Sequence, residues 1–176
     1  TATVDVASFA NALSVENVGA SVATLAVGTA TPFSYEGSDL EVKTCGRLEV
    51  PEGAVFNVNT PKTHVADDEI VKVVDGGEFL VDGGLVDFTR GSENVDKSDE
   101  GFRGTFLVTS ADPTRLSRLR ITSGLFKYLP YWGGSDGGAG SPVKIGCGGR
   151  LELSGTAVAE FRTSWWWNTP LVLDDG

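Results

Sequence analysis

One short apolar phrase recurs along this chain and limits its fold more than any other feature. Its pattern is L-x-[VIL]-x-x-G-x-[VF], which LEVPEGAV (48–55) and LRITSGLF (119–126) match in full. Two further copies match with one residue fewer before the glycine, one copy is looser, and the last is partial. Unequal copies of one phrase are typical of repeat units that carry insertions in their loops. The copies begin at residues 13, 48, 79, 119, 151 and 171.

Apolar residues alternate within each copy, which predicts strands with one buried face. The glycines predict sharp bends between these strands, because glycine adopts positive φ without steric cost. A further strand is expected before several copies, for example in EVKTCG and PVKIGCGG. The predicted unit is therefore strand, glycine turn, strand, glycine turn, strand. A short helix over 112–118 is the one helical alternative.

We predict a single all-β domain over residues 1–176, folded as a right-handed parallel β-helix of about five irregular coils. The alternative is a β-sandwich or jelly roll, which also has many short strands joined by glycine turns. Repetition of one phrase in one order favours the β-helix, because the strands of a sandwich have no reason to resemble each other. The inward positions predict buried columns of side chains, at Val50, Val55, Val81, Val86, Ile121, Phe126, Leu153 and Val158.

The segments CGRLEVPEGAVFNV, GGEFLVDGGLVDF and CGGRLELSGTAVAEF resemble coils of the pectate-lyase-like and autotransporter-passenger β-helices. This superfamily contains secreted enzymes, adhesins and phage tailspikes, and the resemblance covers about residues 40–176. It implies a right-handed parallel β-helix. The calcium-binding carboxylate cluster and the catalytic arginine of the pectate lyases have no match here, so the resemblance does not carry an activity with it.

Charge and composition exclude some partners. The net charge of −10 repels phosphate backbones and anionic lipid headgroups, so we expect neither nucleic-acid binding nor direct membrane insertion. No run of about 18 apolar residues occurs that could span a bilayer. The chain has no methionine and begins TATVDV, which is consistent with a processed secreted chain or an excerpt from a longer protein. We therefore expect an extracellular or cell-surface location.

Catalytic and metal-binding signals are sparse, and we predict that the protein is not an enzyme. The spacing of Cys45 and Cys147 fits no zinc motif, and His64 is the single histidine. Calcium is the one cofactor suggested, by an acidic loop at 93–101 that is rich in possible oxygen ligands. A solvated insertion loop is the alternative interpretation of this segment. The candidate calcium ligands are Asp96, Asp99 and Glu100.

Two aromatic clusters stand in or beside loops. FKYLPYWGG contains Tyr128, Tyr131 and Trp132, which are candidates for stacking on the sugar rings of a surface glycan. SWWWNTP contains Trp165, Trp166 and Trp167, which are candidates for a protein interface. Side chains of adjacent strand residues point to opposite faces, so at least one of these three tryptophans is expected outside the core. The alternative is a local cap over the end of the core.

The two ends of the chain predict self-assembly. The N-terminal segment 1–12 alternates apolar residues without a coil of its own, and the C-terminal segment LVLDDG is half a repeat. Unpaired strands at both ends favour a head-to-tail contact between copies, with 1–12 as a donor strand or an N-terminal extension. We expect a secreted structural or adhesive protein and an extracellular filament. The alternatives are a polysaccharide-binding or polysaccharide-cleaving β-helix, and a module of an adhesin or phage tailspike. The expected interface residues are Val4, Val6, Phe9, Trp165, Trp166, Trp167, Leu171 and Leu173.

Overall fold

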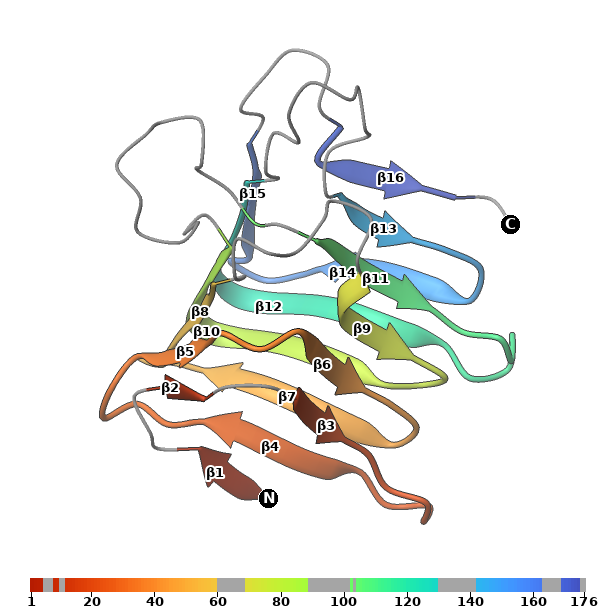
Figure 1. Ribbon diagram of the computed structural model, residues 1–176, viewed down its shortest axis with the longest axis horizontal. Coiled ribbons are helices and arrows are strands. Elements are labelled where there is room, and N and C mark those ends of the chain that lie inside the picture. Colours follow the sequence, from red (N-terminus) through yellow and green to blue (C-terminus); the bar gives the residue numbers. More distant parts are fainter. Residues whose placement is uncertain are drawn as a thin grey trace.

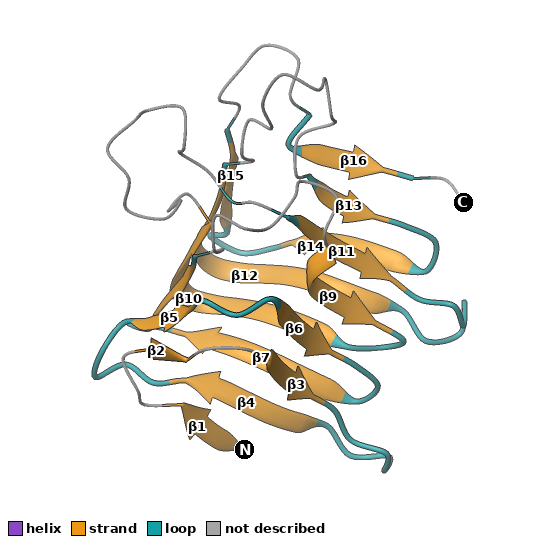
Figure 2. Ribbon diagram, in the orientation of Figure 1, coloured by secondary structure: helices purple, strands orange, loops and turns teal. Residues whose placement is uncertain are grey.

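The described part of the chain consists of strands and turns, and its strand pairings are all parallel. They build one sheet of ten strands and one of six, which lie as layers with the first strands at one end and the last at the other (Figure 1). No helix occurs in this part of the chain (Figure 2). The computed structural model describes residues 1–4, 8–9, 12–59, 69–88, 102, 104–129, 142–162 and 169–174.

The chain passes repeatedly between the two sheets, and one or two strands of the ten-stranded sheet precede each strand of the six-stranded sheet. The ten-stranded sheet contains β1 (Ala2–Val4), β2 (Ser8–Phe9), β4 (Ala23–Val27), β5 (Phe33–Tyr35), β7 (Gly46–Pro51), β8 (Val55–Val58), β10 (Glu78–Phe88), β12 (Ser117–Tyr128), β14 (Gly149–Leu153) and β15 (Val158–Phe161). The six-stranded sheet contains β3 (Ala12–Val15), β6 (Asp39–Val42), β9 (Glu69–Val74), β11 (Thr105–Thr109), β13 (Val143–Ile145) and β16 (Leu171–Leu173).

The prediction of a right-handed parallel β-helix of about five irregular coils is wrong. The predicted unit had a separate short strand on each side of every glycine turn. Instead β10 continues through Gly83, and β12 continues through Gly124. Both β7 and β8 pair with β10, and both β14 and β15 pair with β12, so the segments before and after the predicted corner belong to one sheet. The strands therefore form two layered parallel sheets. The jelly-roll alternative is not supported either, because that fold is built from antiparallel strands.

The helical alternative over 112–118 is not adopted. The N–H of Arg115 donates to the carbonyl of Asp112 at 2.9 Å within a turn, and β12 begins at Ser117.

Three glycines in equivalent positions bring the two sheets into contact. Each stands immediately before or at the start of a strand of the ten-stranded sheet, and a Cβ there would lie 2.0 to 2.1 Å from a carbonyl oxygen of the six-stranded sheet. Only glycine permits so close an approach of two backbones. This explains the repeated glycine before the apolar phrase. The glycines are Gly46, Gly77 and Gly149, and the facing oxygens belong to Val15, Val42 and Val108 respectively.

The core lies between the sheets and confirms part of the predicted columns. Five of the eight expected residues are fully buried: Val50, Val81, Val86, Ile121 and Phe126. A ladder of rings continues the core across the strands, from the Phe33–Phe56 stack (centroids 5.3 Å apart) to the Phe126–Phe161 pair (6.0 Å).

The prediction of burial is wrong for the other three residues, for two different reasons. Val55 is only partly buried because Phe56, one residue later, is in register with Val86. A slip of one residue moves a side chain to the other face of a strand. Val158 lies in the same row as Val55, through Leu85 and Leu125, so it also falls outside the row that faces the core. Leu153 is exposed because no described strand pairs with the outer side of β14.

Candidate assembly interface

Both sheets end in strands that have a partner on one side only among the described residues. At the N-terminal end these are β1, β2 and β3, and at the C-terminal end they are β14, β15 and β16. Figure 1 shows the two groups at opposite ends of the molecule. An edge strand presents N–H and C=O groups that can pair with another chain. We refer to β1, β2 and β3 as the N-terminal edge, and to β14, β15 and β16 as the C-terminal edge.

The C-terminal edge leaves the end of the core open. Leu153 is in register with the buried Ile121, yet 54% of its surface is exposed. Leu173 is in register with Ile145, which is 7% exposed, yet Leu173 is 69% exposed. Val158 on β15 is also half-exposed, in a row that is only partly buried on the inner strands. Leu153 and Leu173 therefore present apolar side chains in rows that form the core elsewhere in the protein.

Two carboxylates of the C-terminal edge, those of Glu152 and Asp174, form ion pairs within the chain. The guanidinium of Arg118 lies 3.3 Å from the carboxylate of Glu152, and Lys144 Nζ lies 3.0 Å from Asp174. Natural sheet edges are often protected by charges that point into the path of an incoming strand. Here these charges lie alongside neighbouring strands of the same molecule, and the leucines remain accessible.

The N-terminal edge has a different composition. Its three strands, with the sequences ATV, SF and ALSV, contain no charged residue. Leu13 on β3 packs partly against the core, and Val15 is 7% exposed. An apolar strand could therefore pair with these three strands without desolvating a charged side chain on them.

The predicted interface residues fall partly on these two edges. Val4 and Phe9 lie on β1 and β2, and Leu171 and Leu173 form the ends of β16. Val6 and the tryptophans Trp165, Trp166 and Trp167 lie outside the described residues. Sequence analysis missed Leu153 and Val158 as interface residues. It placed both residues in the predicted buried columns.

Of the three predicted glycan-binding residues, only Tyr128 lies within the part of the chain that the structure describes. Tyr128 is fully buried in the aromatic ladder, and its hydroxyl donates to the carbonyl of Gly104 at 3.3 Å. Burial raises the pKa of this hydroxyl well above its usual value. A ring in this environment has no face open to a sugar. Tyr131, Trp132 and the candidate calcium ligands Asp96, Asp99 and Glu100 lie outside the described residues.

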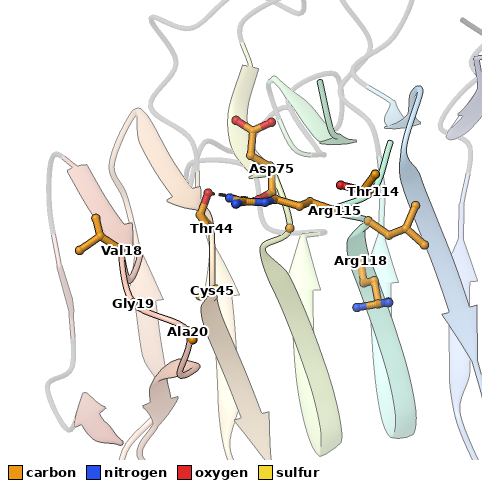
Figure 3. A pocket seen from close by; sticks show the side chains of 11 residues that line it. Val18, Gly19, Ala20, Thr44, Cys45, Asp75, Thr114, Arg115 and Arg118 are labelled. Carbon is orange, nitrogen blue, oxygen red and sulfur yellow. Dashed lines mark hydrogen bonds between the residues drawn. The ribbon is translucent and has the colours of Figure 1, made fainter. Parts of the chain in front are cut away.

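A shallow hollow of about 510 Å³ lies over the turns that join the two sheets (Figure 3). The hydroxyl of Thr44 donates to the main-chain carbonyl of Asp75 at 3.2 Å, and the carboxylate of Asp75 accepts from the N–H of Ala111 at 3.2 Å. Arg115 lies 3.7 Å from Asp112. These polar groups connect successive turns, so we assign them a structural role. Both cysteines of the chain are free.

The described residues contain no group of three or more His, Cys, Asp or Glu side chains arranged to hold a metal ion. Over the same part of the chain, no helix has the length and apolar character needed to cross a membrane. Comparisons of the chain with models of protein families, with curated proteins and with solved structures each returned no match. The resemblance to the pectate-lyase-like and autotransporter-passenger proteins therefore stays a prediction.

Proposed function

We propose that this chain is a structural protein that assembles head to tail with copies of itself through β-strand pairing, and that the assembly is an extracellular filament. The observation that carries the proposal is the open end of the core at Leu153 and Leu173. A second copy that brings one apolar strand to each sheet at this edge would cover both side chains. The uncharged strands at the opposite end of the same chain have the required character.

Apolar burial alone is too weak to hold two copies together. Full burial of a leucine contributes about 1.5–3 kcal/mol, and these side chains are already partly covered. Loss of translational and rotational freedom costs about 4–15 kcal/mol. The remaining binding free energy has to come from backbone hydrogen bonds along the three edge strands. Each such hydrogen bond contributes about 0.5–1.5 kcal/mol net. Strand pairing is therefore a necessary part of the proposal, and contact between apolar side chains is insufficient.

The experiment compares the unmodified chain with a double variant, Leu153→Lys with Leu173→Lys. We expect oligomers that grow with concentration for the unmodified chain, measured by analytical ultracentrifugation and negative-stain electron microscopy. The double variant should be monomeric, because two ammonium groups would be desolvated in the interface. Circular dichroism should show an unchanged fold, since both side chains are exposed in the single chain.

The matched control is Glu69→Lys, which also raises the net charge by two, on an exposed residue of β9 in the middle of the six-stranded sheet, and should assemble normally. An unmodified chain that remains monomeric at all accessible concentrations would overturn the proposal. The glycan-binding hypothesis, with Tyr131 and Trp132 as its remaining candidates, would then be the one to test with polysaccharide arrays.

A further inference from the structure

We infer that the next copy docks in a single register, with β14 beside its β1, β15 beside its β2 and β16 beside its β3, all parallel. The inference rests on the proposed function and adds the partner of each edge strand. Residues that are in register form rows across the strands of each sheet. Each row ends at the C-terminal edge with a residue that the first residue of the same row, on the N-terminal edge of the next copy, can follow.

The ten-stranded sheet supplies the first row. Leu151 on β14 is in register with the buried Leu119, and at the other end Ala2 on β1 is in register with Leu25. Docking of β14 against β1 would place Leu151 beside Ala2 of the next copy, and Leu153 beside the backbone of Val4. The complete row is Ala2, Leu25, Leu48, Phe79, Leu119 and Leu151.

The six-stranded sheet supplies the second row, which ends in the most exposed leucine of the C-terminal edge. Leu173 would lie beside Val15 of the next copy, in a row that is apolar throughout. Each interior member of this row is at most 7% exposed, so continuation of the row would bury Leu173 in the same environment. The row is Val15, Val42, Val73, Val108, Ile145 and Leu173.

A slip of one residue would break the rows at all three strands. The pairing of β14, β15 and β16 within one copy fixes which way their side chains face, so a slip would set inward side chains of one copy beside outward side chains of the next. The outward side chains of the C-terminal edge include Glu152 and Glu160. In the proposed register these two glutamates lie beside Thr3 and Ser8 of the next copy, where they meet no like charge.

Cysteine cross-linking tests the register directly. The first pair is Thr3→Cys with Glu152→Cys, made in a chain that also carries Cys45→Ser and Cys147→Ser. Neighbouring strands lie about 4.8 Å apart, within the range of Cα separations that a disulfide spans. Thr3 and Glu152 of one molecule are separated by five strand spacings, about 24 Å, so a bond between them has to join two copies.

The matched control is Thr3→Cys with Arg150→Cys, which is displaced by two residues along β14. The displacement puts the two Cα atoms about 8 Å apart in the proposed register, too far for a disulfide. A second pair, Ser14→Cys with Val172→Cys, tests the six-stranded sheet independently. After mild oxidation, both matched pairs should give a ladder of covalent oligomers on a non-reducing gel, at least tenfold more than the control.

The outcomes separate the register from the proposed function. If the variants form oligomers in the ultracentrifuge but the control pair cross-links as efficiently as the matched pairs, the register is wrong and self-assembly stands. Oligomers without cross-links in either matched pair would also overturn the register. If the chain does not form oligomers before oxidation, the register and the proposed function are both wrong.

Discussion

Leu153 is in parallel register with Ile121, and yet Ile121 is fully buried while Leu153 is 54% exposed. The two residues occupy the same place in successive copies of the repeat. The difference between them is that β12 has a strand on each side, whereas β14 is paired with β12 alone among the described strands.

The first prediction compares these two positions. Ile121→Ala should lower the free energy of unfolding by about 2–5 kcal/mol, because it leaves a cavity in the core. Leu153→Ala should lower it by less than about 1 kcal/mol in the monomer, since half of that side chain is already in contact with water. Urea denaturation at a concentration where the protein is monomeric gives both values. Equal losses at the two sites would contradict an open core at β14.

The second prediction concerns the bend inside β12. Gly124 has φ of +84°, and a Cβ there would lie 2.3 Å from the carbonyl oxygen of Gly84. Gly124→Ala should therefore destabilise the fold by more than about 1 kcal/mol, from backbone strain and a clash with the main chain. Thermal unfolding followed by circular dichroism measures the loss. Gly19→Ala is the control, because its Cβ would meet only a side chain, at 3.4 Å, and should have little effect.

The third prediction concerns pH. Hydrogen bonds from Lys43 and then Lys72 lower the pKa of Glu41. A carboxylate with a lowered pKa stabilises the fold above its unfolded pKa of about 4.3, and this contribution disappears as pH falls through the folded value. Glu41→Gln should therefore lower Tm most near pH 7, and the difference should shrink below about pH 4. The control is Glu52→Gln, in the exposed turn after β7. A difference between Glu41→Gln and the unmodified chain that does not change with pH would contradict the ion-pair interpretation.

The fourth prediction concerns like charges at the proposed interface. Glu16 follows Val15 on β3, and Asp174 follows Leu173 on β16, so the proposed register brings these two carboxylates together. Glu16→Gln should strengthen assembly about twofold at low ionic strength, because Lys144 already offsets part of the charge of Asp174. The gain should fade in about 1 M salt because salt screens the repulsion. Sedimentation at matched concentrations measures the effect. Glu69→Gln, on an exposed residue of β9 in the middle of the sheet, is the control and should leave assembly unchanged.

Much of the secondary structure was readable from the repeated phrase, because alternation within a strand is a local property. It located the strands around Val50, Val81 and Ile121 and identified these residues as inward-facing. It did not show that Phe56, and not Val55, continues the row of Val86. Pairing between strands decides that register, and hydrogen bonds between segments about 30 residues apart set it.

Only the tertiary structure decided how the strands are grouped and which repeat forms an edge. A glycine that permits a bend does not determine whether the strand ends there, and at Gly83 and Gly124 the pairing continues into one sheet. Burial likewise depends on a neighbour that the local sequence does not specify. Leu153 and Leu173 have the sequence pattern of core residues, and they are exposed because no described strand pairs with the outer side of β14 or β16.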